Sequence, residues 1–317
     1  MLFTPAGLEQ ATRTRVARWR AERFRDAGVR RVWDLGCGIG SDAMAFAEAG
    51  LDVVAVDADP TTVAVASHNL ALVGAGPARL GRAEDARPGP HDAVFLDPAR
   101  RTARGRTWRV ADLTPPWDVV RGHLDGPGFV AVKLGPGVPK EVLPVDAEWC
   151  WVSDAGDVVE ASVWNRVAGR RAVRLGDGDA KELRSTGAEL EVAPIGAFVG
   201  EPDGAALRAG LLAEAAGEGA WRLAPGLGYV SSDAPVATGW VTNFRVLDVL
   251  PHSRKALARY VREHDVGRLE IKQRGFDVDP AVLRRALKPR GSRAATILLA
   301  HTTVGARAIV AERVVAG

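Results

Sequence analysis

Apolar residues in the first half of the chain gather into short, nearly continuous runs separated by longer amphipathic stretches. Such runs are typical of parallel strands buried on both faces, and the stretches between them have helical spacing. The stretch Thr4–Ala27 also has helical spacing, with arginines among its apolar residues, and predicts one or two leading helices. This alternation predicts an α/β domain with a mainly parallel sheet. The predicted strands are Val32–Leu35, Leu51–Asp57, Ala93–Leu96 and Phe129–Leu134.

Beyond these strands the pattern changes twice. Trp149–Ser153 and Val158–Trp164 alternate as an antiparallel hairpin, so we expect the first domain to end near residue 168. From residue 170, short apolar runs with Gly and Pro turns predict an extension with one helix near Ala205–Ala216. From Phe244 onward, strands and helices alternate cleanly. The predicted organisation is a helical leader at 1–29, an α/β domain at 30–168, a linking region at 169–243 and a smaller α+β domain at 244–317.

One short segment, Val32–Asp42, compresses a strand, a tight turn and a helix start, and it reads VWDLGCGIGSD. Glycines at 36, 38 and 40 let the backbone approach a ligand, because side chains would block that approach. Ser41 or Asp42 can cap the following helix. A nicotinamide-type fingerprint needs glycine at position 41, where serine stands, so the pattern argues against that cofactor. A tight turn without any ligand is the simpler alternative.

The spacing Asp-x-Gly-x-Gly-x-Gly resembles the first motif of class I S-adenosylmethionine (SAM) methyltransferases. This resemblance implies a Rossmann-like seven-stranded sheet and a glycine turn that lies against the methionine and ribose of SAM. The carboxylate after the second strand can accept hydrogen bonds from both ribose hydroxyls, or can simply cap a helix. An acid after the third strand would face the adenine amino group, or belong to a surface turn. The expected cofactor-binding residues are Asp34, Gly36, Cys37, Gly38, Gly40, Asp57, Ala58, Glu84 and Asp85.

The stretch HDAVFLDPARR ends an apolar strand at Asp97 and Pro98, and ligands of open α/β sheets bind at the carboxyl ends of strands. Proline cannot continue the sheet, so the carboxylate would face the pocket. The stretch resembles motif four of nucleobase methyltransferases, in which Asp-Pro-Pro and an aromatic residue hold an amine and stack the base. Ala99 and Arg100 replace the last two positions here, and Trp108 could supply the missing ring.

Lys133, near the end of the predicted strand Phe129–Leu134, is the third candidate catalytic residue besides Asp97 and Pro98. Together with Glu160, Lys133 and Asp97 resemble three members of the Lys-Asp-Lys-Glu set of ribose 2′-O-methyltransferases. The first lysine of that set is absent, because no lysine precedes position 133. An ion pair between Lys133 and Asp97 that only holds the pocket together is the alternative.

An arginine-rich loop, Arg100–Arg109, follows the strand that ends at Asp97. It carries arginines at 100, 101, 104, 106 and 109, with Trp108 among them. Such a loop can grip phosphates and stack one base, or it can be a solvated loop. We take Arg100, Arg101 and Trp108 as candidate substrate-binding residues.

The segment LEIKQRGFDVDPAVLRRALKPRG resembles the THUMP-like domain at the carboxyl end of a group of bacterial class I methyltransferases. THUMP domains bind RNA, especially tRNA, so the resemblance implies an RNA partner. Residues 244–313 hold 15 Lys or Arg against 7 Asp or Glu, a net charge of +8, which favours the same partner. The candidate RNA-binding residues are Lys272, Arg274, Arg284 and Lys288.

Composition excludes several other classes of protein. The net charge of +3 is too balanced to indicate a nucleic-acid partner by itself. Two cysteines, Cys37 and Cys150, make neither a disulfide framework nor a four-ligand zinc site, so we expect no metal. No apolar run approaches a membrane span, and the first residues do not have the basic-then-apolar pattern of an export signal, which favours the cytoplasm.

The resulting hypothesis is a SAM-dependent methyltransferase that methylates tRNA or rRNA at a base nitrogen or a ribose oxygen. Two alternatives stay open: a methyltransferase of small molecules, and an RNA-binding protein that keeps SAM without turnover. The oligomeric state is left undetermined.

Overall fold

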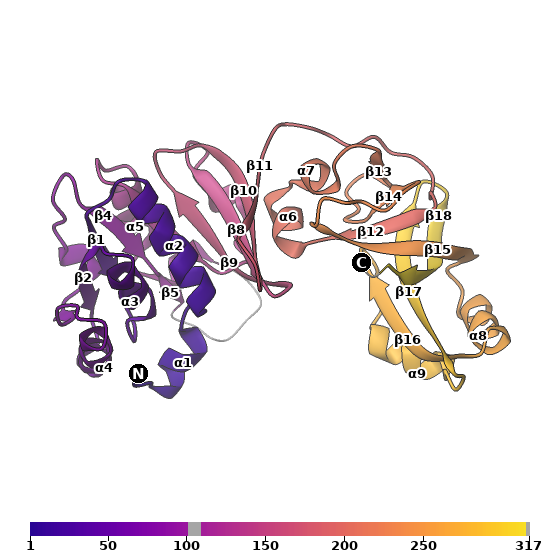
Figure 1. Cartoon of the computed structure of the whole chain (residues 1–317), viewed down its shortest axis with the longest axis horizontal. Helices are drawn as coiled ribbons and strands as arrows, with labels where there is room; N and C mark the ends of the chain where they lie inside the picture. Colours follow the sequence, from indigo (N-terminus) through magenta and orange to yellow (C-terminus); the bar gives the residue numbers. More distant parts are fainter. Residues whose placement is uncertain (101–108, 315–317) are drawn as a thin grey trace. The chain divides into compact units, whose positions relative to one another are not determined.

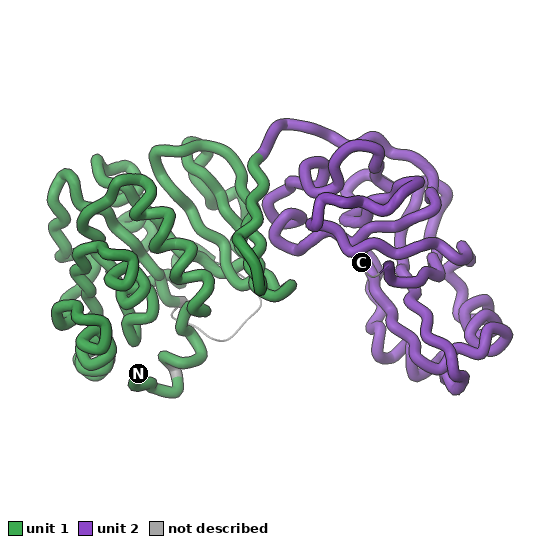
Figure 2. The backbone as a smooth tube through the Cα atoms, viewed as in Figure 1, with its two compact units in different colours: residues 1–184 green, residues 185–317 purple. Residues whose placement is uncertain are grey.

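The structure is a computed structural model, and it describes residues 1–100 and 109–314. The chain divides into two compact units, residues 1–184 and 185–317 (Figure 2). Within the described part of the chain, no helix is both long and apolar enough to cross a bilayer.

The first unit is built on one sheet, which contains nine strands among the described residues. Its strand order is β11-β10-β8-β9-β7-β4-β1-β2-β3. The stretch from β3 to β8 is the seven-stranded class I methyltransferase sheet that the sequence predicts, with five parallel strands followed by an antiparallel pair. The strands are β1 Arg31–Leu35, β2 Asp52–Asp57, β3 Arg79–Leu80, β4 Ala93–Leu96, β7 Val130–Leu134, β8 Glu148–Asp154, β9 Asp157–Trp164, β10 Gly169–Leu175 and β11 Lys181–Arg184. The strand order reverses between β1 and β4, which is where such sheets bind ligands.

Strands β10 and β11 carry the first unit beyond the boundary expected near residue 168. β10 pairs in parallel with β8, and β11 pairs with β10. Arg171 on β10 is buried and places Nε 2.9 Å from Oε1 of Glu148 on β8. Val173 and Leu175 join the main core. The sheet therefore absorbs the first part of the expected linking region.

Helices cover the sheet of the first unit, and α2 and α3 lie over one face of it (Figure 1). Phe24 of α2 makes edge contacts with Phe46 of α3 and Phe129, at centroid distances of 5.2 and 5.4 Å. The α-helices are α1 Pro5–Gln10, α2 Thr14–Asp26, α3 Ser41–Glu48, α4 Pro60–Ala71 and α5 Trp117–Leu124. Shorter elements are the 3-10 helices η1 Ala83–Asp85, η2 Val110–Asp112 and η3 Lys140–Val142, and the paired strands β5 Ala99–Arg100 and β6 Leu113–Thr114.

The second unit has its own sheet, with seven strands among the described residues in the order β13-β14-β12-β15-β18-β17-β16. Its strands are β12 Phe198–Pro202, β13 Ala220–Arg222, β14 Val230–Ser232, β15 Val241–Pro251, β16 Val266–Gln273, β17 Arg293–Thr302 and β18 Gly305–Arg313. β12 pairs with β15, so this sheet extends across the boundary expected at residue 244.

Helices of the second unit follow the predicted pattern with two differences. The expected helix at 205–216 is two helices, because Gly210 takes a left-handed φ of 71° after the first. The helix expected to include Lys288 ends at Leu287, and Lys288 is its left-handed C-cap. The helices are α6 Gly204–Ala209, α7 Leu212–Ala216, α8 Arg254–Glu263 and α9 Pro280–Leu287. Leu257 of α8 and Leu287 of α9 share one core with Ile297 and Leu299 of β17.

Candidate functional site

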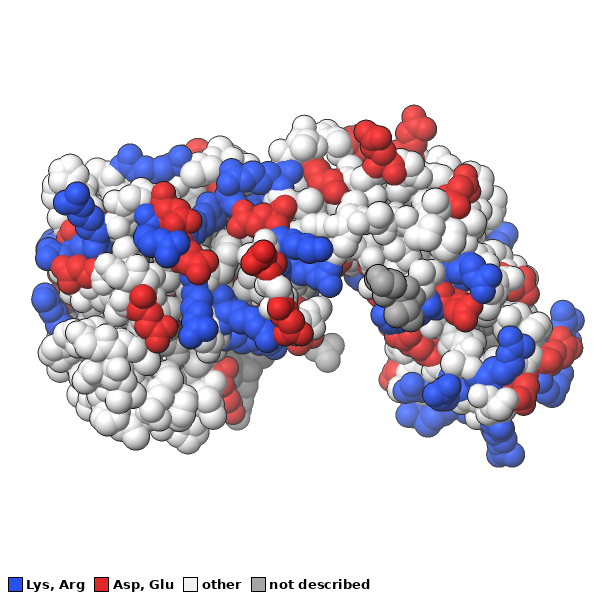
Figure 3. Space-filling model, viewed as in Figure 1, with Lys and Arg blue, Asp and Glu red and all other residues white. Residues whose placement is uncertain are grey.

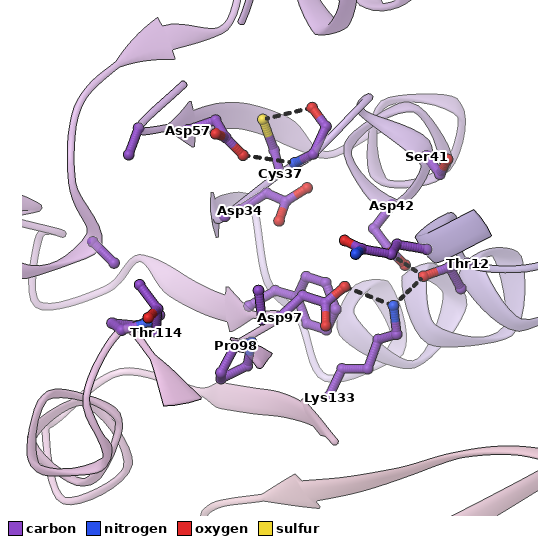
Figure 4. Close-up of a pocket in the computed structure, with 18 of the residues that line it drawn as sticks. Thr12, Asp34, Cys37, Ser41, Asp42, Asp57, Asp97, Pro98, Thr114 and Lys133 are labelled. Atoms are coloured by element: carbon purple, nitrogen blue, oxygen red, sulfur yellow. Dashed lines mark hydrogen bonds and ion pairs between the residues drawn. The ribbon is translucent and has the colours of Figure 1, made fainter. Parts of the chain in front are cut away.

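A cavity of about 650 Å³ lies at the carboxyl ends of β1, β2, β4 and β7 in the first unit (Figure 4). Ten of the residues predicted from the sequence line it. They are Asp34, Gly36, Cys37, Gly38, Asp57, Ala58, Glu84, Asp97, Pro98 and Lys133. Two others, Gly40 and Asp85, are not among its lining residues. Since these strands run parallel, residues far apart in sequence meet at one edge of the sheet.

The glycine turn follows β1 and is anchored to β2. The backbone N–H groups of Gly36 and Cys37 both donate to the carbonyl of Val56, at 2.9 and 3.0 Å. Gly36 has a φ of +87°, and a Cβ there would lie 3.4 Å from the carbonyl oxygen of Asp97. Gly38 has a φ of +53° with open space around it. Left-handed backbone favours glycine at both positions, and the open space faces the cavity.

Gly40, also predicted to bind the cofactor, is not among the residues that line the cavity. It is the N-cap of α3 in left-handed backbone, and a Cβ there would lie 3.6 Å from the Cα of Ala66 on α4. Its left-handed φ of +87° is the feature that favours glycine at this position. Cys37 does line the cavity, but burial, followed by the nearby carboxylates of Asp34 and Asp57, raises the pKa of its thiol far above the ordinary range. That thiol is therefore neutral and is not a nucleophile.

Asp57, at the end of β2, is fixed by two backbone N–H groups. Gly38 N–H donates to Oδ2 and Asp59 N–H donates to Oδ1, both at 3.0 Å. Figure 4 shows its carboxylate against the glycine turn. Each oxygen of an ionised carboxylate has two acceptor positions, so both oxygens can still accept hydrogen bonds from a ligand.

Asp34 is a buried carboxylate without a partner. Its residue is 1% exposed, and neither carboxylate oxygen makes a hydrogen bond with the described residues. Burial, followed by the charges of Asp42 and Asp97, raises the pKa of Asp34 well above its ordinary value. Figure 4 shows Asp34 between Asp57 and Asp97. Leaving such a group unsatisfied costs free energy, so this wall of the cavity favours a cationic or hydrogen-bond-donating ligand.

Lys133 of β7 joins Asp97 to the amino-terminal segment. Its Nζ donates to Oδ2 of Asp97 at 2.6 Å and to Oγ1 of Thr12 at 3.0 Å (Figure 4). Thr12 in turn donates to Oδ2 of Asp42 at 2.6 Å. Burial alone would lower the pKa of Lys133, but Asp97, Asp42 and Glu160 together raise it. The ammonium is therefore held charged beside Asp97.

The same network continues into the core through Arg20 of α2. Arg20 is fully buried, pairs with Asp42, and places Nη2 2.5 Å from Oε2 of Glu160. Glu160 does not line the cavity. Of the three residues that resemble the ribose 2′-O-methyltransferase set, Lys133 and Asp97 form an ion pair in the cavity. Glu160, the third, pairs with Arg20 in the core instead.

Two parts of the cavity wall were not predicted from the sequence. One is the amino-terminal segment, which contributes Gly7 and Gln10–Thr12; the other is Leu113–Pro115. The Asn69 side chain anchors the first segment, since it accepts from Leu2 N–H at 2.6 Å and donates to the Leu2 and Ile39 carbonyls at 3.0 and 2.8 Å. These contacts join residues distant in sequence, and no local pattern indicates them.

The candidate substrate-binding residues fall into three groups. Arg101 and Trp108 lie outside the described residues, and Arg100 is described only as backbone in β5. Lys272 and Arg274 lie near Glu201 of β12, with Lys272 Nζ 2.7 Å and Arg274 Nη2 3.5 Å from its carboxylate. Arg284 and Lys288 are exposed at α9. Figure 3 shows Lys and Arg gathered on this part of the second unit.

Across residues 1–100 and 109–314, no group of three or more His, Cys, Asp or Glu side chains is arranged to hold a metal ion.

Comparisons with known proteins agree with this architecture. A methyltransferase domain family matches residues 33–97, and a family described as THUMP domain-like matches residues 241–313. Two S-adenosylmethionine-dependent methyltransferases of Mycobacterium tuberculosis, from strains CDC 1551 / Oshkosh and H37Rv and both described as uncharacterised, are each 37% identical over 316 residues. The match covers 96% of this chain and 85% of each relative.

A solved structure of a candidate methyltransferase from Porphyromonas gingivalis W83 has a TM-score of 0.81 with this chain. It is 20% identical, and the likeness covers 98% of this chain and 82% of that one, which shows a shared fold. The fold, the cavity at the strand ends and the M. tuberculosis relatives lead to one conclusion. The chain belongs to the family of S-adenosylmethionine-dependent methyltransferases, and its carboxyl-terminal part is THUMP domain-like.

Proposed function

We propose that this enzyme methylates RNA, either tRNA or rRNA, at a base nitrogen or a ribose oxygen. The observation that carries the proposal is the exposed basic surface of α9 in the unit that matches the THUMP domain-like family. Exposed cations of this kind attract phosphate backbones. An RNA of either class would be met in the cytoplasm.

SAM fits the residues of the cavity. Asp57 would hold the ribose hydroxyls, and the turn from Gly36 to Gly38 would lie against the methionine and ribose. The partnerless carboxylate of Asp34 suits the cationic amino group of the methionine part, since ion pairing would satisfy a buried charge. Glu84, which lines the cavity, is preferred over Asp85 for the adenine amino group. SAM supplies an electrophilic methyl group bound to a positively charged sulfur.

Asp97 is the residue that we assign to the methyl acceptor. Its Oδ2 is held by Lys133, while Oδ1 makes no hydrogen bond with the described residues. That second oxygen can accept a hydrogen bond from an N–H or O–H group and orient its lone pair. The ion pair with Lys133 holds the Asp97 side chain in place, so we assign Asp97 mainly an orienting role, with proton removal second.

A direct test is the analysis of RNA from a strain that lacks the enzyme. Mass spectrometry of digested tRNA and rRNA should show one methylated nucleoside lost relative to wild type, and restored by adding the purified enzyme and SAM. An unchanged nucleoside profile in both RNA classes would favour the small-molecule alternative. Binding of RNA without any methyl transfer would favour the alternative of a silent SAM-binding protein.

A second test concerns the basic surface. Arg284→Glu combined with Lys288→Glu should weaken binding of tRNA or rRNA fragments and reduce the slope of affinity against salt, because phosphate contacts release counterions. Binding of SAM should be unchanged. The matched control is Arg25→Glu combined with Arg31→Glu, the same change of charge at two exposed arginines of the first unit, and it should bind RNA like the wild type. Equal RNA binding by the double variant and the wild type would contradict the assignment of this surface.

A further inference from the structure

Three aromatic rings meet at one edge of the second unit. His252 follows β15, Phe276 follows β16, and His301 lies near the end of β17. β16 and β17 are parallel, and β15 and β17 both pair antiparallel with β18, so the three strands run the same way. Their carboxyl ends therefore lie at the same edge, which brings the rings together.

Phe276 is the centre of this group. Its ring is stacked on the His301 ring, with centroids 4.2 Å apart and an interplanar angle of 13°. The His252 ring makes an edge contact with Phe276 at 4.7 Å. Phe276 is half-buried, packs against the core beneath α8 and α9, and donates its backbone N–H to Oε1 of Gln273 at 3.2 Å. The core therefore fixes the Phe276 ring, and Phe276 in turn supports the two histidine rings.

His301 is exposed, although its ring is stacked on Phe276. Its backbone pairs with Ala306 of β18, but its ring makes no hydrogen bond or ion pair with another described residue. A ring held flat by a stacked neighbour loses little conformational freedom when a second flat group is added to the stack. Unstacked nucleobases bind proteins in this way, on Phe, Tyr, Trp or His rings.

We propose that His301, supported by Phe276 and His252, is a stacking platform for an unpaired base of the RNA substrate. This inference rests on the proposed function and adds a subsite to it. Arg254 and Lys255, exposed at the start of α8 directly after His252 and Ser253, lie where they can contact the adjoining phosphates. Asp277, the exposed acid beside Phe276, disfavours phosphate on that side, so the RNA backbone passes on the α8 side.

Another exposed histidine in the same unit provides a matched comparison. The His264 ring is stacked on Tyr260 with centroids 3.8 Å apart and an interplanar angle of 10°. Its sequence neighbours are the exposed acids Glu263 and Asp265, which repel a phosphate backbone. His264 Nδ1 also lies 3.1 Å from the carbonyl of Tyr260. The stacking geometry is similar, but the surroundings do not suit RNA.

The test uses the full chain and single-stranded RNA of about 12 nucleotides, within the site sizes of single-strand binding proteins. Fluorescence anisotropy would give the affinity at several salt concentrations. His301→Ala should weaken binding about tenfold without changing the salt slope, because a stack holds no phosphate. His301→Tyr should restore affinity, and Phe276→Leu, which keeps an apolar anchor, should weaken it. His264→Ala should bind like the wild type.

Each outcome has a distinct meaning. Salt-dependent RNA binding that is the same in the wild type and in His301→Ala would overturn the platform and leave the proposed function standing. A reduced salt slope in His301→Ala would also overturn it, because that result indicates a phosphate contact. No RNA binding by the wild type would overturn the RNA assignment, and the platform with it.

Discussion

The Nζ of Lys133 lies 2.6 Å from Oδ2 of Asp97, so the ends of β7 and β4 are joined across the floor of the cavity. The side chains are 15% and 33% exposed, respectively. Both side chains are partly shielded from solvent, and the ammonium of Lys133 occupies Oδ2 of Asp97. The other oxygen, Oδ1, is left to accept a hydrogen bond from the methyl acceptor. Asp97 is therefore a fixed acceptor whose position depends on the lysine.

Asp97→Ala should lower the rate of methyl transfer by about two orders of magnitude or more, because the acceptor loses its orienting partner. Cofactor affinity should stay within a few fold, since the residues assigned to SAM are elsewhere on the wall. The measurements are single-turnover rates on the RNA substrate and calorimetry with SAM. A variant that loses SAM binding to the same degree would make Asp97 a cofactor-binding or structural residue.

Thr12→Val should lower kcat roughly tenfold, which corresponds to about 1.4 kcal/mol, because Lys133 loses one of its two partners. Thr12→Ser keeps the hydroxyl and should restore most of the rate. Valine also leaves Asp42 with one hydrogen bond fewer, so the variant should melt at a lower temperature. If the serine and valine variants have the same rate, the hydroxyl does not position Lys133.

Asp57→Ala should weaken SAM binding at least tenfold. The loss of charged hydrogen bonds to the ribose is expected to cost about 1.5–3 kcal/mol, and the variant also frees the N–H of Gly38 from its anchor. Isothermal calorimetry measures the change, with circular dichroism to check the fold. Asp85→Ala is the control, since Asp85 is not a lining residue. Unchanged affinity in Asp57→Ala would refute the ribose assignment.

Asp34 should make the stability of the ligand-free protein depend on pH. Its pKa is raised in the folded state, so its contribution to folding is full below the unfolded pKa of about 3.9 and is lost as pH rises through the folded pKa. In that window the free energy of unfolding should fall by up to about 1.4 kcal/mol per pH unit. Denaturant titrations of wild type and Asp34→Asn should diverge there.

The affinity for SAM should change with pH in the opposite direction to the stability of the ligand-free protein. Ionisation of Asp34 favours a cationic ligand, so SAM should bind the wild type more tightly as pH rises through the same window. Asp34→Asn should bind SAM more weakly and without that dependence. Parallel pH profiles for the two proteins would show that Asp34 does not face the positive charge of the cofactor.

Local patterns predict the parts of this fold that depend on neighbouring residues. The strand predicted at Ala93–Leu96 has those bounds in the structure, because an apolar run that stops at Asp-Pro has one register and one end. The glycine turn is likewise specified by its own backbone requirements. Strands, turn and strand-end acids were therefore accessible from the sequence.

Contacts between distant residues were not accessible in this way. Thr12 reaches Lys133 only after α1 and α2 have folded against the sheet, and Leu113–Pro115 join the wall from beyond the arginine-rich loop. Charge counting also treats all basic residues alike. It could not reveal that Lys272 faces Glu201, whereas Arg284 is exposed.

The Asn69 side chain connects Leu2 with the glycine turn through Ile39. Amides near a chain end normally exchange their hydrogens with solvent rapidly. The Leu2 amide, which donates to Asn69, should instead be protected, and its exchange rate should fall further when SAM orders the turn. Hydrogen–deuterium exchange of the first peptide would thus report occupancy of the cavity without an attached fluorophore, a substrate or catalytic turnover.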